Sequence, residues 1–275
     1  MIDLQQGDCL ELISKLPNNS IDLVLTDPPY CNTHQSWDKM LDWPVLWQEL
    51  RRVCKENAAK VFFSVNAFTI DLCTSNRKEY RYRYCWEKTC PTNVYNCKRM
   101  PLRNYEEICV FYQKQCTYNP QMGEGPAYNQ KPRIDRQSIW GATNPNWSGG
   151  VTKEECEKAG IALDGHEQYH HLVIKPRREN ITSRYPLDIL KFKSVHNFSK
   201  NRLHPNQKPV ELLEFLIKTY TNEGETVLDF TMGSGSTGEA CINTGRNFIG
   251  MELDPNMFTV AKGRLDALLD MSASA

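Results

Sequence analysis

Residues 225–252 read ETVLDFTMGSGSTGEACINTGRNFIGME, and this stretch is the strongest indication of the fold class. Its apolar runs predict a strand, a glycine-rich turn, a helix and a second strand. Gly233, Gly235 and Gly238 form the pattern GxGxxG in the turn, and Glu252 follows Gly233 by nineteen positions. Such glycines let the backbone approach a ligand closely, and an acid at that distance can accept hydrogen bonds from ribose hydroxyls. The stretch predicts a nucleotide or nucleoside pocket; a tight turn without a ligand is the plainer alternative.

The rest of the sheet has to come from the N-terminal half, because fewer than forty residues follow Gly238. A dinucleotide-binding fold normally opens with this unit, so the order is circularly permuted and disfavours an NAD enzyme. Strand-like runs alternate with helical periodicity, which predicts a doubly wound, mostly parallel α/β sheet. The predicted strands are Ile21–Thr26, Val61–Val65, Tyr82–Trp86, Ile108–Tyr112, Glu225–Asp229 and Asn247–Glu252, and the predicted helices or helical turns are Leu10–Leu16, Trp43–Val53, Phe68–Cys73, Val210–Tyr220, Thr237–Asn243 and Asn256–Leu269.

The composition is that of a globular enzyme. The chain has 275 residues, of which 40% are hydrophobic and 24% charged, and its formal net charge is zero. These values exclude a disordered, collagen-like or disulfide-stapled chain. No apolar run approaches the length of a membrane span and the N-terminus has no secretory pattern, so we expect a soluble, cytoplasmic protein. Eleven cysteines without a CxxC pair predict free thiols and no metal site.

Periodicity fails between Gln113 and Asn201, where prolines, asparagines and glycines are frequent. Residues 114–200 carry 13 Lys/Arg and 9 Asp/Glu, a balance of +4 against −4 for the rest. A loop-rich segment that is more basic than its surroundings indicates a polyanionic partner, and a solvated face of mixed charge is the alternative. We expect residues 1–113 and 201–275 to form two halves of one core, with 114–200 as an inserted module.

Three further motifs accompany the glycine-rich turn. The sequence reads DPPY at 27–30, HPNQKP at 204–209 and GDC at 7–9. Together with DFTMGSGS at 229–236, they resemble the S-adenosylmethionine-dependent DNA amino-methyltransferases of the β class. In that class the catalytic motif precedes the cofactor motif, and the target-recognition region lies between them. The resemblance therefore implies a methyltransferase core with 114–200 as its recognition insert.

The resemblance covers residues 1–113 and 202–270 and has mild departures. The proline of the family's DPF is replaced by Thr231, and Asn206 stands where Thr is common. Neither change removes a group that the chemistry needs. The resemblance implies cofactor contacts from Asp8, Cys9, Asp27, His204, Asn206, Gln207, Lys208, Asp229, Phe230, Thr231, Gly233, Ser234, Gly235, Ser236, Thr237 and Glu252, and catalytic roles for Asp27, Pro28, Pro29 and Tyr30.

The chemistry explains the catalytic motif. The exocyclic amine of adenine or cytosine is a poor nucleophile because its lone pair is conjugated into the ring. Asp27 and the carbonyl of Pro28 would accept its two N–H bonds and favour a tetrahedral nitrogen. Tyr30 would stack on the base, which has to be flipped out of the duplex at a cost of a few kcal/mol. Plainer alternatives are a turn at Asp27, a helix cap at Asp8 and a surface charge at Lys208.

We therefore expect methyl transfer to N6 of adenine in double-stranded DNA. In the resembling family the cytosine-N4 enzymes more often have Ser before Pro-Pro-Tyr, whereas this chain has Asp27. Cytosine N4, an RNA or protein acceptor, and an inactive DNA-binding module stay open, as do a restriction–modification, orphan or phage role. Similar enzymes are often dimers, so a homodimer is a further expectation. The basic residues of the insert that we expect to bind DNA are Arg133, Arg136, Arg177 and Arg178.

Overall fold

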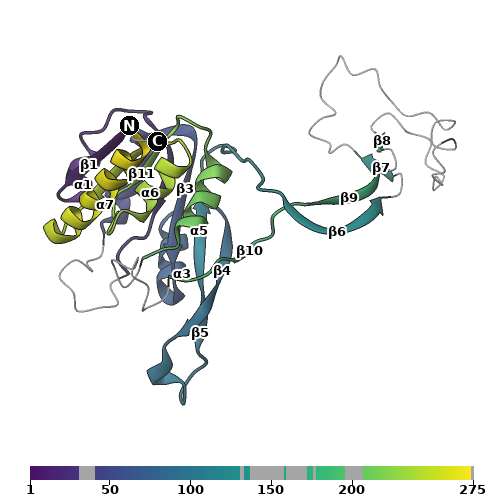
Figure 1. The fold of residues 1–275 in the computed structure, drawn as a ribbon, viewed down its shortest axis with the longest axis horizontal. Helices are drawn as coiled ribbons and strands as arrows, with labels where there is room; N and C mark the ends of the chain where they lie inside the picture. The colour runs from purple at the N-terminus through teal and green to yellow at the C-terminus, as the bar shows by residue number, and fades with distance from the viewer. Residues whose placement is uncertain are drawn as a thin grey trace. The chain divides into compact units, whose positions relative to one another are not determined.

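The computed structural model describes residues 1–30, 41–130, 133–136, 158, 172–175, 178–195 and 207–273. Its main unit, Met1–Gln121 with Leu187–Ala275, is built on an eight-stranded sheet in the order β1-β12-β11-β2-β3-β5-β4-β10 (Figure 1). Neighbouring strands pair in parallel, except that β5 is antiparallel to both β3 and β4. The predicted α/β fold with a mostly parallel sheet is confirmed.

Several elements have the bounds that the sequence predicts. These are β2, α2, α5 and β12, whereas β3, β4 and β5 are longer than predicted and β1 was not predicted. The strands of the main sheet are β1 (Ile2–Gln6), β2 (Ile21–Thr26), β3 (Cys54–Ser64), β4 (Tyr80–Thr92), β5 (Arg103–Phe111), β10 (Ile189–Lys191), β11 (Thr226–Asp229) and β12 (Asn247–Glu252). The helices are α1 (Cys9–Ile13), α2 (Trp43–Val53), α3 (Asn66–Ser75), the 3-10 helix η1 (Val94–Asn96), α5 (Val210–Tyr220), α6 (Ser236–Asn243) and α7 (Pro255–Ala273).

Helices pack on both faces of the sheet, because its central strands are apolar on both sides. On one face Leu25 of β2 belongs to a core with Leu216 of α5 and with side chains of α6 and α7. On the other face the next residue back, Val24, belongs to a second core with Leu50 of α2 and with side chains of α1 and α3. Successive strand residues point to opposite faces, so the continuous apolar run of β2 is what a central strand needs.

The chain order creates a crevice between β11 and β2. These strands are parallel neighbours, but the chain continues from β11 to β12 on one side and from β2 to β3 on the other. Such a topological switch point leaves a gap at the carboxyl ends of the two strands, and ligands of open α/β sheets bind there. The glycine-rich turn follows β11 and Asp27 follows β2, so both predicted motifs lie at this edge.

The second compact unit is Met122–Pro186. Strand β6 (Gly123–Gln130) pairs with β9 (Arg178–Arg184), and β7 (Arg133–Arg136) pairs with β8 (Leu172–Lys175), both antiparallel. The division therefore lies inside the segment 114–200 that the sequence sets apart, and β10 returns to the main sheet with Leu190 buried. A recognition role for the insert stays a prediction.

Two features of the composition have structural counterparts. No helix within the described ranges is both long and apolar enough to cross a membrane. The cysteines of those ranges are free thiols, and Cys9, Cys54, Cys109, Cys116 and Cys241 are buried. These five pack as small apolar side chains.

Candidate active site

A cavity of about 440 Å³ opens at the switch point. Gly235 is not part of its lining, and His204 and Asn206 lie outside the described residues. The predicted site residues that line it are Asp8, Cys9, Asp27, Pro28, Pro29, Tyr30, Gln207, Lys208, Asp229, Phe230, Thr231, Gly233, Ser234, Ser236, Thr237 and Glu252.

Further residues line the cavity that the sequence analysis did not assign to it. Most of them are close in sequence to a predicted strand or motif. Their position beside the end of a predicted strand is the signal by which they could have been predicted. They are Gly7, Leu10, Thr26, Leu41, Asp42, Phe63, Leu213, Leu253, Asp254 and Met257.

The glycine-rich loop depends on its glycines for two different reasons. Gly233 and Gly235 have φ of +51° and +77°, a region that other residues rarely adopt. At Gly238 a Cβ would lie 2.6 Å from Cδ1 of Leu265 and 2.9 Å from Phe248, so the absence of a side chain lets α6 pack closely. The pattern GxGxxG therefore combines a tight turn with close helix packing.

Glu252 fastens this loop to the end of β12. Its carboxylate accepts the backbone N–H groups of Gly233 and Asp254, each at 2.9 Å. Burial raises the pKa of Glu252, and the backbone donors oppose that shift. Each carboxylate oxygen has a second lone pair, so the side chain can still accept ribose hydroxyls.

Asp229 is buried at the end of β11 and is bound by uncharged donors. Its Oδ1 accepts the hydroxyl of Thr26 at 2.8 Å and the N–H of Thr231 at 3.2 Å, while Oδ2 accepts the hydroxyl of Thr237 at 2.6 Å. Burial raises the pKa of Asp229 to about 6 despite these bonds. The side chain ties β2, β11 and α6 together at the floor of the cavity.

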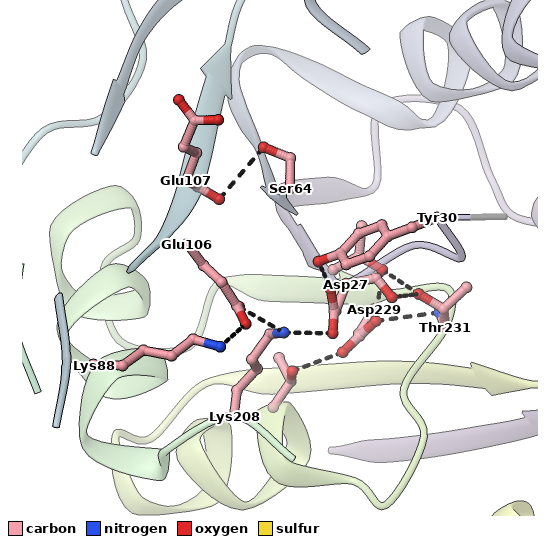
Figure 2. A network of polar contacts seen from close by, with 11 residues as sticks. Asp27, Tyr30, Ser64, Lys88, Glu106, Glu107, Lys208, Asp229 and Thr231 are labelled. Atoms are coloured by element: carbon pink, nitrogen blue, oxygen red, sulfur yellow. Dashed lines mark hydrogen bonds and ion pairs between the residues drawn. The ribbon is translucent and has the colours of Figure 1, made fainter. Parts of the chain in front are cut away.

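Asp27 lies at the end of β2 and is bound by a tyrosine and a lysine. Its Oδ1 accepts the Tyr30 hydroxyl, and its Oδ2 pairs with Nζ of Lys208 at 2.6 Å (Figure 2). The Tyr30 ring lies 4.8 Å from that of Phe68. Burial and the charge of Asp27 raise the pKa of Tyr30 well above its usual value, so the hydroxyl stays protonated and donates. The motif thus folds its own tyrosine against its own carboxylate.

Lys208 connects Asp27 to a buried chain of charges. Its Nζ also pairs with Glu106 at 3.0 Å, and Glu106 in turn pairs with Lys88 (Figure 2). Burial alone would lower the pKa of Lys208, but Asp27 and Glu106 raise it above its usual value. Burial would likewise raise the pKa of Glu106, but Lys208 and Lys88 lower it. Lys208 was predicted as a cofactor contact, whereas Glu106 was not predicted as a site residue, because its ion-pair partners lie far from it in the chain.

The cavity fits S-adenosylmethionine. Its volume is in the range of roughly 300–1,000 Å³ that small-molecule sites have. A Cβ at Gly233 would meet nothing within 4 Å, so the loop backbone is open to a ligand. Glu252 offers acceptors for the ribose, and Asp8 lines the same cavity while one of its oxygens caps α1 through Leu10 N–H at 2.9 Å. The hydrogen-bond acceptors, the apolar walls and the open backbone of the loop suit a ligand that carries an adenosine and a positively charged sulfur.

The predicted DNA-binding arginines lie in the second unit. Arg133 and Arg136 bound β7, and Arg178 begins β9. Arg177 lies outside the described residues. Their role in DNA binding stays a prediction.

Comparison with known proteins agrees with this site. Type II methyltransferase M.HpaI of Haemophilus parainfluenzae is 25% identical over 274 residues, covering 95% of this chain and 73% of that protein. DNA adenine methyltransferase YhdJ of Escherichia coli (strain K12) is 26% identical over 281 residues, covering 97% and 83%.

Solved structures show the same fold. The crystal structure of the M1.HpyAVI–SAM complex matches with a TM-score of 0.57 and 24% identity, covering 96% of this chain and all of that one. PvuII DNA methyltransferase, described as cytosine-N4-specific, matches with a TM-score of 0.61 and 16% identity, covering 96% and 86%. The model of the N6/N4 DNA methylase family matches residues 21–263, which is most of the chain. The protein therefore belongs to the N6/N4 DNA methylase family, whose methyl donor is S-adenosylmethionine.

Proposed function

We propose that the protein methylates the exocyclic N6 of adenine in double-stranded DNA. The observation that carries this proposal is Asp27, a carboxylate at the end of β2 that lines the cofactor cavity. Membership of the DNA methylase family supports DNA as the substrate. The aspartate before Pro-Pro-Tyr, where cytosine-N4 enzymes more often have serine, favours adenine, and one relative is named as a DNA adenine methyltransferase.

Different residues of the cavity would have different roles in methyl transfer. S-adenosylmethionine supplies an electrophilic methyl group on a positively charged sulfur. Asp8, Glu252 and the loop of Gly233 would hold its adenosine, as the contacts of this loop support. Orientation and exclusion of water are then the main tasks of the protein. Leu213, Phe230 and Met257 give the cavity apolar walls suited to both.

Asp27 would make the target nitrogen nucleophilic. Its carboxylate accepts one N–H of the flipped base, and the carbonyl of Pro28, held in direction by two proline rings, accepts the other. The lone pair of the nitrogen then leaves the ring plane and attacks the methyl carbon, while the bond from that carbon to sulfur breaks. The nitrogen afterwards loses a proton, and Asp27 is a base within reach. The extruded base would stack on Tyr30, whose ring packs on its other side against the buried ring of Phe68.

Nucleoside mass spectrometry tests the proposal. Unmethylated DNA of varied sequence is incubated with S-adenosylmethionine and either the wild type or Asp27→Ala, and cofactor binding is measured for both. N6-methyladenine with the wild type alone confirms the reaction, the base and the acid. N4-methylcytosine would keep the mechanism and overturn the choice of adenine. Methylation of RNA or protein, or DNA binding without any transfer, would overturn DNA methylation.

We also propose that the segment 114–200 recognises the target and that the enzyme is a homodimer. Replacing Arg177 and Arg178 by alanine should weaken DNA binding and flatten its dependence on salt. An unchanged salt slope would remove both from the interface. Sedimentation at micromolar concentration tests the homodimer, and a monomeric mass would contradict it.

A further inference from the structure

Strands β4 and β5 run on past the carboxyl edge of the sheet. Strand β3 ends at Ser64, which is opposite Glu107, whereas β4 and β5 continue pairing to Thr92 and Arg103 (Figure 1). Residues 88–103, the β4–β5 arm, join them outside the sheet. The cofactor cavity opens at the same edge, so the arm stands on the side from which a target base has to enter.

The arm is positively charged and has no acid. It contains Lys88, Lys98, Arg99 and Arg103 and neither Asp nor Glu. Lys98 and Arg99 are exposed, and within the described part of the chain neither has an ion-pair partner. Nε of Arg103 is buried there without a hydrogen-bond partner. Lys88 pairs with Glu106, which leaves three cations of the arm without an ion-pair partner among the described residues, and such a cluster suits a polyanion.

The tip of the arm is apolar although it is exposed. Tyr95 is fully exposed, and Val94, Met100 and Leu102 are 59%, 52% and 42% exposed. Exposed apolar side chains among cations are found where proteins press against the bases in a DNA groove. A purely solvated hairpin has no need of them.

A groove at the base of the arm contains one further cation that is unpaired within the described part of the chain. Its charged lining residues are Glu87 and Lys88 from β4 and Lys191 and Lys193 beyond it, and Lys88 is already paired with Glu106. Lys191 pairs with Glu87 at 3.5 Å, and Lys193 is exposed without an ion-pair partner among the residues that the structure describes. Within the described ranges, unpaired cations therefore lie at the tip of the arm, in Lys98 and Arg99, and at its base, in Lys193.

The arm is long enough to reach along a duplex whose target base is in the cavity. Glu106 lies near Asp27, because Lys208 forms ion pairs with both carboxylates. Met100, at the tip of the arm, is six residues before Glu106 in the sequence. Six residues span at most about 20 Å. That distance corresponds to about six nucleotides along a DNA strand at about 3.4 Å each.

We propose that the β4–β5 arm is a DNA-binding element beside the flipped base, separate from the 114–200 insert. Lys98 and Arg99 bind backbone phosphates, and Tyr95 with its apolar neighbours packs against the groove. This proposal rests on the proposed action on duplex DNA. It adds a contact on the main unit, where no sequence motif indicated one.

The salt dependence of DNA binding tests this proposal. Binding of a fluorescein-labelled 40-base-pair duplex is measured at several salt concentrations for the wild type and for the double variant Lys98→Ala, Arg99→Ala. The variant should bind more weakly, and the slope of log K against log salt should fall by about 1.8, since each phosphate contact contributes about 0.9. The control removes Lys55 and Lys114, two exposed lysines paired with Asp22 and Glu56 at the opposite edge of the sheet. That control should keep the wild-type slope.

Two results would overturn the proposal. One is an unchanged slope in the arm variant, or an equal change in the control. The other is that Tyr95→Ala changes the sedimenting mass and leaves DNA binding unchanged, which would make the arm a contact between copies of the chain. The nucleoside assay is run on the same preparations. A wild type that methylates no DNA would refute the proposed function, while the salt slopes would still decide whether the arm binds DNA.

Discussion

Two aspartates at neighbouring strand ends have opposite environments. Asp229 ends β11 and accepts hydrogen bonds from two threonine hydroxyls and one backbone N–H, all uncharged. Asp27 follows β2 and pairs with Lys208 at 2.6 Å. Residue Asp229 is 4% exposed, whereas the side chain of Asp27 is 24% exposed. Thr231 joins the two sites, because its hydroxyl donates to the Asp27 carbonyl at 3.2 Å.

The two environments suit two different roles, stabilisation of the fold for Asp229 and a part in the reaction for Asp27. Neutral donors cannot offset the burial of Asp229, so its pKa rises to about 6 and its charge is weakly supported at neutral pH. Asp27 instead pairs with a lysine at a partly exposed position, where a substrate amine can reach it. We infer that Asp229 organises the cavity and that Asp27 acts on the substrate.

The largest effect is expected at Asp27. Asp27→Asn keeps the shape of the side chain but weakens the acceptor and turns one oxygen into a donor group. Methyl transfer should fall by roughly 10²–10⁴, the size of a general acid–base contribution. Single-turnover rates with calorimetric cofactor binding measure this. A rate of the variant within fivefold of the wild-type rate would show that the carboxylate of Asp27 is not needed for the reaction.

A pH-dependent effect on stability is expected at Asp229. A folded pKa of about 6, against an ordinary value of 3.8, means that this group favours the folded state fully below pH 4. That contribution is lost as the pH rises to 6, and the loss amounts to about 3 kcal/mol. The destabilisation by Asp229→Asn should therefore shrink by that amount between pH 4 and pH 7.

Urea unfolding of the wild type and Asp229→Asn at several pH values checks this prediction. The difference in unfolding free energy is compared across the series, so the titration of every other group cancels. A difference that is flat with pH would mean that Asp229 is ionised at no cost in the folded state. Cofactor binding of the variant at pH 7 controls for a collapsed cavity.

A smaller effect on rate is expected at Lys208. Lys208→Met leaves Asp27 and Glu106 without their shared cation, so kcat should fall about tenfold to a hundredfold, or about 1.4–2.7 kcal/mol, and the protein should lose stability. Adding Glu106→Gln restores a net charge of zero to the cluster of Lys88, Glu106, position 208 and Asp27, although it also removes the ion-pair partner of Lys88. The double variant should regain part of the lost stability but not kcat, with KM for the cofactor unchanged.

This pair of variants separates positioning from folding. Recovery of both stability and kcat in the double variant would show that Lys208 acts only on the fold. Thermal unfolding and steady-state kinetics on the same samples give the two readouts.

The smallest effect on the rate is expected at Thr237, one of the neutral donors. Thr237→Val removes the 2.6 Å hydrogen bond to Asp229 and should lower the unfolding free energy by about 1.5–3 kcal/mol, with kcat of the folded fraction within a few-fold of wild type. Guanidinium unfolding and kinetics below the melting temperature measure both. A large loss of kcat in a Thr237→Val protein that remains stable would indicate that Asp229 takes part in the reaction.

The regular elements were predictable because their signals are local. The bounds of β2 and α5 follow from an apolar run and from helical periodicity, and the turn and packing needs of the glycine loop are written into GxGxxG. Strand β1 was missed because its alternation of apolar and polar residues covers only Ile2 to Gln5, and it is held by parallel pairing with β12, which lies at the other end of the chain. The arm was missed because its exposed residues have no periodicity.

The fold class, the order of the motifs and the methyltransferase resemblance could be predicted from the sequence, since each motif is recognised from residues within its own short stretch. The residues that surround Asp27 could be identified only in the folded molecule. Lys208 and Glu106 come to it from distant positions, through the register of β5 on β3 and the placement of the segment before α5. No local pattern encodes such contacts, because a buried ion pair depends on how far apart two chain segments lie after folding.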